Sequence, residues 1–241
     1  MALPGLALRV GITGHRLDKL AESSLEPLRE QLRELLAGIE AAMVRLATRA
    51  TAAPHGSGPP RCCLVSALAE GADRLAVDAA PAHWPIHALL PMPRGIYRHD
   101  FLADGQETSP SAKAFERYLA RAETVTELPM ETALPGAEPA DRTAQYAALG
   151  RALVRGIDCL VAIWDGKPPS GPGGTATVVA EAVELGRPVL WLRPDGGQPQ
   201  LIERFQGGDI SRPQIVLADA STLDEILDRA SPRHPGADPA S

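Results

Sequence analysis

Short apolar runs alternate with segments of helical periodicity along most of the chain, and this order constrains the fold more than any other feature. Strands are expected at 8–13, 62–65, 86–90, 123–128, 159–164, 188–192 and 215–217. Helices are expected at 25–50, 72–80, 113–121, 143–156, 175–185 and 222–230. A strand, a helix and a second strand in succession form a right-handed crossover, so the order predicts a mainly parallel sheet. The runs are continuously apolar, which is typical of strands covered on both faces.

The chain therefore predicts an α/β, Rossmann-like fold, with a mainly parallel sheet and helices on both faces. Its 241 residues, 44% of them apolar, suffice for one domain with a sizeable core, which we place at residues 1–230. The Pro- and Gly-rich stretches 51–60 and 129–139 are interpreted as insertions, not domain boundaries. Residues 231–241 are predicted to be a disordered tail.

The net charge is −6, which argues against general nucleic-acid binding because such proteins usually present a basic face. Pro4, Gly5 and Arg9 interrupt the first ten residues, so no signal peptide is predicted there. No apolar run approaches the ~20 residues that a membrane helix needs. We expect a soluble, cytoplasmic protein.

The chain contains three cysteines, Cys62, Cys63 and Cys159, whose spacing matches neither a zinc site nor a disulfide framework. We interpret them as core residues in a reducing compartment. No metal site and no resident cofactor are identified, whereas a nucleotide ligand is expected from the loops that follow.

Residues 161–176 resemble a phosphate-binding element: the strand-like run 161–164, then Asp165-Gly166, a Pro/Gly loop, and Gly173-Gly174-Thr175 before a helix. Glycines let the backbone approach an anion, and the first turn of the helix offers unpaired N–H groups at its positive end. The same residues also suit simple helix capping.

A second such element opens the chain at 10–16, with Thr13, Gly14, His15 and Arg16 after an apolar strand. Arg16 and Gly14 suit phosphate binding. Alternatively, Gly14 only shapes a tight turn, His15 lies at the surface, and Arg16 pairs with a neighbouring carboxylate.

The segment 66–73 follows the second strand and holds Ser66, Glu70, Gly71 and Asp73. Its carboxylates suit ribose hydroxyls. Alternatively, Ser66 and Asp73 cap the next helix, and Gly71 serves only the turn.

The segment 91–101 follows the third strand and holds Tyr97, Asp100 and Phe101. An aromatic ring here can stack on a base. Alternatively, Tyr97 and Phe101 pack a lid onto the body of the protein. Because ligands of open parallel sheets lie beyond the carboxyl ends of the strands, we expect all four segments to converge there.

The motifs Val-Gly-Ile-Thr-Gly-His-Arg at 10–16, Ser-Ala-Leu-Ala-Glu-Gly-Ala-Asp at 66–73, Leu-Pro at 90–91 and Gly-Gly-Thr-Ala at 173–176, with Tyr97 and Asp100-Phe101 between them, together resemble the SLOG superfamily. This superfamily groups DNA-processing protein A with the lonely-guy phosphoribohydrolases, and the resemblance covers residues 8–192. It implies a Rossmann-like sheet that binds a nucleotide or nucleotide-derived molecule. Some members split nucleoside monophosphates at the N-glycosidic bond, and others are sensor domains, often in bacterial conflict systems.

The chain departs from the hydrolase motif Pro-Gly-Gly-x-Gly-Thr-x-x-Glu. With Thr175 aligned to the motif Thr, Val178 stands at the glutamate position, and the nearest acid in this helix is Glu181. This departure favours a sensor or regulatory domain, which would act through a separate effector protein or a homo-oligomer.

Two other functions remain open at this point. One is a nucleotide N-glycoside hydrolase or transferase, with Glu70, Asp100 or Asp165 as its catalytic carboxylate. The other is an interaction module whose loops are purely structural. The ligand-binding candidates are Thr13, Gly14, His15, Arg16, Ser66, Gly71, Asp73, Tyr97, Asp165, Gly173, Gly174 and Thr175.

Overall fold

The computed structural model describes residues 6–49, 58–102, 106–130, 142–169, 171 and 173–230. The predicted tail at 231–241 and most of the two predicted insertions lie outside the described residues.

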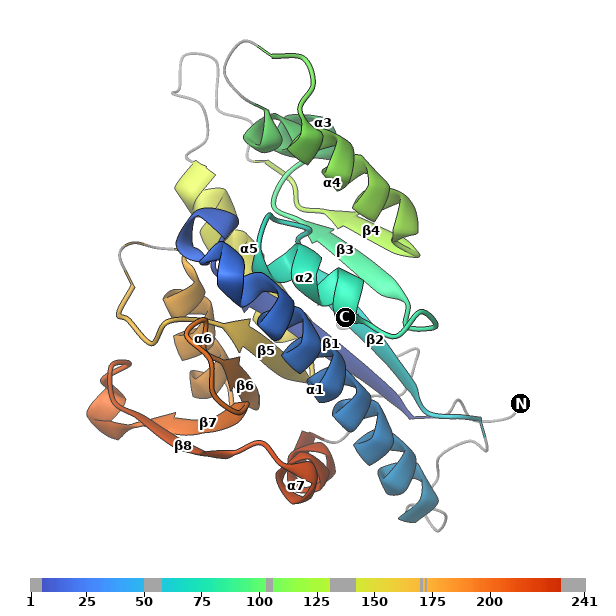
Figure 1. Ribbon diagram of the computed structural model, residues 1–241, viewed down its shortest axis with the longest axis vertical. Helices are drawn as coiled ribbons and strands as arrows, with labels where there is room; N and C mark the ends of the chain where they lie inside the picture. The colour runs from blue at the N-terminus through green and yellow to red at the C-terminus, as the bar shows by residue number, and fades with distance from the viewer. Residues whose placement is uncertain are drawn as a thin grey trace.

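One sheet of eight strands runs through the middle of the molecule (Figure 1). Its strands are β1 (Ala7–Gly14), β2 (Arg61–Ser66), β3 (Ile86–Leu90), β4 (Thr124–Glu127), β5 (Cys159–Ile163), β6 (Val189–Leu192), β7 (Gln200–Phe205) and β8 (Pro213–Leu217). They lie in the order β4-β3-β2-β1-β5-β6-β7-β8. Neighbours from β4 to β6 are parallel, and β7 is antiparallel to both β6 and β8. The predicted mainly parallel α/β sheet is confirmed.

Helices cover both faces of this sheet. They are α1 (Glu22–Arg49), α2 (Ala72–Ala79), α3 (Arg94–Tyr97), α4 (Pro110–Arg121), α5 (Arg142–Gly156), α6 (Thr175–Glu184) and α7 (Ala220–Ala230), with 3-10 turns η1 (Leu17–Lys19), η2 (Arg98–Phe101) and η3 (Gln206–Gly208). Figure 1 shows α1, α2 and α7 in front of the sheet and α5 and α6 behind it. Two clusters of buried apolar residues, one on each face, form the core.

The long helix α1 is held by a continuous apolar stripe. Its buried residues recur every three or four positions, as an amphipathic helix requires: Leu28, Leu32, Leu35, Leu36, Ile39, Ala42 and Met43. They share a core cluster with alternate residues of β1: Leu8, Val10 and Ile12. Burying one Leu or Ile side chain contributes about 1.5–3 kcal/mol, so this stripe fixes α1 on the central strand.

The opposite face of β1 allows α5 to approach closely. A Cβ on Gly11 would lie 2.6 Å from Cδ1 of Ile157, just after α5, so a larger residue there would have to displace this side chain. Asp158 then joins the two strands: the Arg9 N–H donates to Oδ2 of Asp158 at 2.8 Å, and the Asp158 N–H donates to the Arg9 carbonyl at 2.9 Å. These contacts seat β5 beside β1.

The pairing of β1 with β5 creates a switch in strand order. The chain first builds outward on one side of β1 through β2, β3 and β4, and then crosses to the other side for β5 and β6. The carboxyl ends of β1 and β5 are neighbours, with Gly14 opposite Ile163. In open α/β sheets, ligands lie in the crevice at such a switch point.

Strand β7 and the short helix α3 are absent from the elements that the sequence predicts. Strand β7 alternates irregularly, because only Leu201 and Ile202 of its six residues are buried. Cys62 and Cys159 are buried and Cys63 is half-buried, and burial raises the pKa of Cys62 to about 12. Among the described residues, no helix has the length and apolar character to span a bilayer.

Candidate ligand-binding site

Two adjoining cavities lie at the switch point between β1 and β5. The first, of about 350 Å³, is lined by these predicted residues: Thr13, Gly14, His15, Arg16, Asp73, Tyr97, Gly173, Gly174 and Thr175. The second, of about 460 Å³, is lined by His15, Asp165, Gly174 and Thr175 among others. Ser66, Glu70, Gly71 and Asp100 line neither cavity. The structure therefore brings the two predicted phosphate loops together at one edge of the sheet.

The N-terminus of α6 forms the wall between the two cavities. Gly174 is its N-cap residue, and no side chain of the described residues caps it. Gly173 adopts a φ of +77°, and a Cβ there would lie 2.8 Å from the backbone nitrogen of Ala147, so the loop needs glycine at this position. The arrangement offers an anion the positive end of a helix with an open approach.

Arg16 lines the first cavity and is held by Tyr146 of α5. Its Nη2 donates to the Tyr146 hydroxyl at 3.2 Å, and its guanidinium carbon lies 5.7 Å from the centroid of the Tyr146 ring. The Tyr146 hydroxyl donates to Asp100, which also pairs with Arg142. Asp100 thus positions Tyr146, which in turn holds Arg16, and does not itself line the cavity.

Asp73 organises the turn that follows β2. Its Oδ2 accepts hydrogen bonds from the Ser66 hydroxyl at 2.9 Å and from the Ala67 N–H at 2.8 Å. The Ser66 Oγ in turn accepts from the N–H of Leu68, whose φ of 59° is unusual for a leucine. Burial raises the pKa of Asp73 to about 6, although these hydrogen bonds lower it.

Gly71 and Gly14 allow this turn to dock on the loop after β1. Gly71 has a φ of +88°, and a Cβ there would lie 2.3 Å from the carbonyl oxygen of His15. A Cβ on Gly14 would lie 2.4 Å from the Cβ of Ala72. The Ala72 N–H donates to the His15 carbonyl at 3.0 Å, so both glycines serve close packing between the two loops.

Glu70 is engaged away from the cavities. It accepts a hydrogen bond from the Ser111 hydroxyl and lies 4.0 Å from Nη1 of Arg74. The Arg74 guanidinium lies 4.7 Å from the centroid of the Phe101 ring. This cluster fastens α4 to the turn after β2.

His15 and Asp165 connect the ends of β1 and β5. The Asp165 N–H donates to Nε2 of His15 at 3.1 Å. The Asp165 carboxylate lies 3.1 Å from the same nitrogen and 3.0 Å from Nζ of Lys167. Partial burial raises the pKa of Asp165, but hydrogen bonds from Lys167 and the proximity of His15 outweigh it and lower the pKa.

Tyr97 lies in the wall of the first cavity and is fully buried. Its ring packs edge-to-face on Phe101 and Phe115, with centroids 4.9 and 5.5 Å away. Its hydroxyl has no hydrogen-bond partner among the described residues. Burial raises the pKa of Tyr97 well above its ordinary value. The ring is part of the core, whereas the hydroxyl is a buried polar group without a hydrogen bond among the described residues.

Val178 forms part of the wall of the first cavity. It lines the cavity one turn into α6, with 5% of its surface exposed, and a Cβ on Gly150 would lie 2.9 Å from its Cγ2. Glu181 lines neither cavity. Within the described ranges, no cluster of three or more His, Cys, Asp or Glu residues could hold a metal ion.

The sequence matches no protein-family model and no curated protein. Similar solved structures include DNA processing protein A from Helicobacter pylori, described for its single-stranded DNA binding, at 15% identity and a TM-score of 0.43, covering 95% of this chain and 79% of that one. The structural-genomics target TM1055 matches at 18% identity and a TM-score of 0.37, covering 76% and 72%. The molybdenum cofactor carrier protein from Chlamydomonas reinhardtii matches at 19% and 0.36, covering 77% and 76%.

The order and direction of the eight strands establish the fold: the chain is a Rossmann-like α/β protein.

Proposed function

We propose that this protein binds a phosphate-bearing nucleotide at the first cavity and acts as a ligand sensor or regulatory domain. The observation that carries the proposal is that the uncapped N-terminus of α6 and the guanidinium of Arg16 meet in one cavity at the switch in strand order. Helix termini and arginine are two groups that proteins often combine around phosphate.

The individual roles follow from the positions of these groups. Gly173, Gly174 and Thr175 present backbone N–H groups to the phosphate, and Arg16 supplies the opposing charge. Asp165, at the end of β5, is available to ribose hydroxyls from the second cavity. A ligand bound here touches the loops after β1, β3 and β5, so its presence can be passed to a partner protein or a second copy of the chain.

The carboxylates near the site favour binding without cleavage. Glycosidic hydrolysis needs a protonated acid beside the ribose, and Val178 lines the cavity at the position where the hydrolases carry their glutamate. Partial burial raises the pKa of Asp165, the carboxylate nearest to the ribose, but Lys167 and His15 outweigh it and lower the pKa, so Asp165 is ionised and cannot donate a proton. Asp73 is bonded within its own turn, Asp100 is bonded to Tyr146 and Arg142, and Glu70 is bonded to Ser111.

The proposal is tested by placing a charge at the anion position. A Cβ on Gly174 would have its nearest neighbour 3.7 Å away and φ is −81°, so both Gly174→Asp and Gly174→Asn fit the fold. Both side chains cap a helix well, and their comparison isolates the charge. We expect titration calorimetry with AMP and GMP to show about tenfold or greater additional loss of affinity for Asp over Asn. Equal affinities would refute the phosphate site.

The sensor role is tested in the same preparation by chromatography. Incubation with a panel of nucleoside monophosphates is expected to return the intact nucleotides. Release of free base would instead establish an N-glycoside hydrolase.

A further inference from the structure

We propose that the ligand is two-armed: a dinucleotide whose bridging phosphates lie at the N-terminus of α6, with one nucleoside in each cavity. This inference rests on the proposed function and adds the class of ligand to it. It follows from the arrangement of the two cavities around one helix end.

The two cavities share a wall and extend to opposite sides of it. His15, Lys19, Gly174 and Thr175 line both. From this wall the first cavity runs past the ends of β1 and β2 to Tyr97, after β3, and the second runs to the loop after β5. The anion-binding end of α6 therefore lies between two cavities, not at the end of one.

Each cavity has room for one arm. Volumes of about 350 and 460 Å³ both lie within the range of about 300–1,000 Å³ that small-molecule sites occupy. A mononucleotide with its phosphate at α6 fills only one of them. In doubly wound sheets, a dinucleotide lies across the crevice where the strand order reverses, which is the place these cavities occupy.

The charges fit a bridging anion. Arg16 lines the first cavity, Lys167 lines the second, and Lys19 lines both, so cations flank the helix end from each side. The carboxylate of Asp165 lies 3.0 Å from Nζ of Lys167, which leaves a sugar-binding acid beside the cation of the second cavity.

The test compares P1,P2-di(adenosine-5′) diphosphate with AMP by titration calorimetry at about 0.15 M salt, where charges beyond about 8 Å are screened. The variants are Arg16→Ala for the first cavity and Lys167→Glu for the second. The side chain of Lys167 is 80% exposed, so its replacement leaves the fold intact. Lys113→Glu, on the exposed surface of α4, makes the same charge change away from both cavities and is the matched control.

We expect the dinucleotide to bind about tenfold or more tightly than AMP. Lys167→Glu should weaken the dinucleotide about tenfold more than it weakens AMP, because only the dinucleotide enters the second cavity, while Arg16→Ala should weaken both. Equal binding of the two probes, or an equal effect of Lys167→Glu on both, overturns the two-armed ligand and leaves the nucleotide site standing. Failure of the unaltered protein to bind either probe overturns both proposals.

Discussion

At the scale of single residues, the buried carboxylate of Asp73 organises the turn after β2, but its charged form lowers the free energy of unfolding. Its Oδ2 accepts hydrogen bonds from Ser66 and Ala67, and these hold the turn beside the first cavity. Its burial nevertheless raises its pKa to about 6, because desolvation of the charge outweighs the bonds. The turn is therefore most stable when Asp73 is protonated.

This shift predicts a pH dependence. Below about pH 4, Asp73 is protonated in both the folded and the unfolded chain; between pH 4 and 6 only the folded chain keeps the proton. The free energy of unfolding should thus fall over this window, by about 3 kcal/mol for a shift of roughly two units. Urea denaturation of the unaltered protein and of Asp73→Asn should show a stability difference that shifts in favour of the variant as pH rises. Parallel pH profiles would contradict the assignment.

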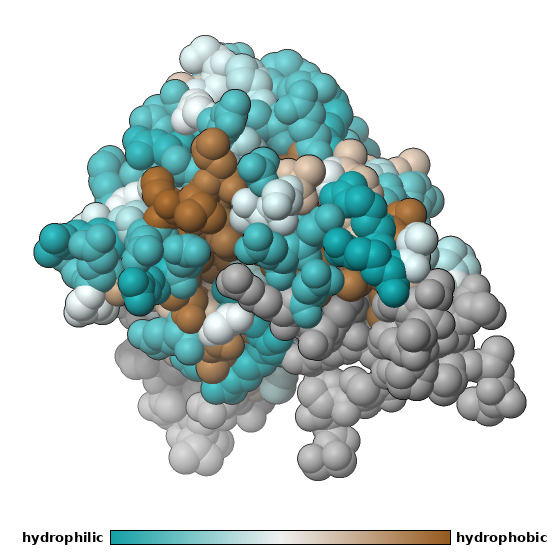
Figure 2. All heavy atoms as spheres, turned by 90° about the horizontal axis from the view of Figure 1, so that it is seen from below, coloured by the Kyte–Doolittle hydropathy of each residue, from teal (hydrophilic) through white to brown (hydrophobic). Residues whose placement is uncertain are grey.

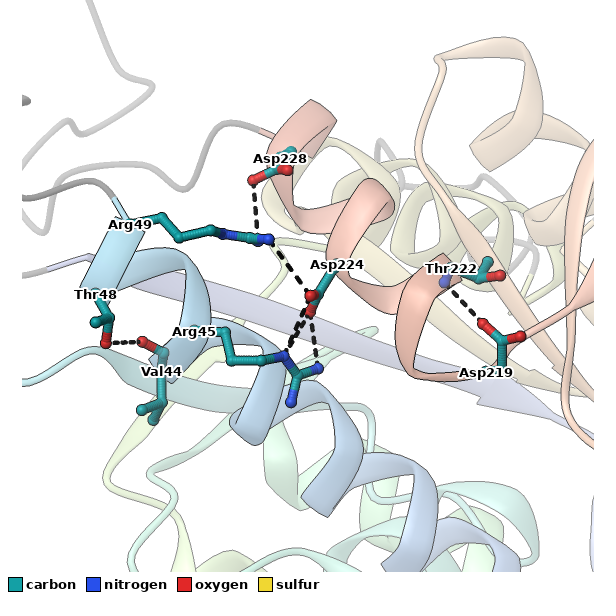
Figure 3. A network of polar contacts seen from close by, with 8 residues as sticks. All are labelled: Val44, Arg45, Thr48, Arg49, Asp219, Thr222, Asp224 and Asp228. Carbon is teal, nitrogen blue, oxygen red and sulfur yellow. Dashed lines mark hydrogen bonds and ion pairs between the residues drawn. The ribbon is translucent and has the colours of Figure 1, made fainter.

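At the scale of elements, α7 is attached to α1 by both apolar packing and ion pairs. Leu223, Ile226 and Leu227 are buried. Figure 3 shows the polar side of the contact: Arg45 and Arg49 converge on Asp224, with Nε of Arg45 2.9 Å from Oδ1. Asp219 accepts from the Thr222 N–H at 2.9 Å and caps the start of α7.

The packing should dominate over the ion pairs. Truncating a buried leucine costs about 2–5 kcal/mol, so Leu227→Ala should lower the free energy of unfolding by that amount. Asp224→Asn should have a far smaller effect, because its partners Arg45 and Arg49 are exposed to water and salt. Chemical denaturation at low and high salt separates the contribution of apolar packing from that of the ion pairs, since only the ion-pair contribution should disappear in high salt. A larger loss in Asp224→Asn than in Leu227→Ala would reverse this ranking.

The elements that sequence reasoning found are those with a strong apolar pattern. Strand β3 has the bounds that the apolar run 86–90 predicts, and α6 begins at Thr175 as predicted. Strand β7 was missed because its polar residues at 200, 203 and 204 break both periodicities. Tyr146 was missed as a site residue for a different reason: it reaches Arg16 and Asp100 only through the tertiary fold, and helical spacing alone assigns it to a packed face.

At the scale of the whole molecule, the sheet has two different open edges. Strand β4 carries Glu127, which pairs with Arg94. Strand β8 has no charged residue, and its Ile215, Val216 and Leu217 are 39%, 40% and 53% exposed. Figure 2 shows apolar side chains gathered on the underside of the molecule, the side on which β7, β8 and α7 lie in Figure 1. Natural sheets usually protect such edges with charges.

The β8 edge should therefore promote concentration-dependent self-association. Val216→Lys introduces the kind of charge that protects an edge strand and should lower the apparent mass in sedimentation experiments at high protein concentration. Thr124→Lys on β4, the edge already protected by charge, is the matched control and should change little. Nucleotide binding should stay the same in both variants, because strands β6 and β7 separate β8 from the β1–β5 site. An unchanged mass distribution for Val216→Lys would show that the edge is inert.

The pairing of β1 with β5 also has a consequence for how the protein is made. Among the eight strands of this sheet, the central β1 is synthesised first, and its second edge is filled only after Cys159 of β5, the partner of Val10, has been made. Until then the growing chain can complete only β1 to β4, with one side of β1 open to solvent. Such distant pairing slows folding, because a long loop must close before its contacts form. A nascent chain arrested before residue 159 should consequently depend on chaperones, and the crevice at the strand ends cannot assemble before β5 and α6 have been made.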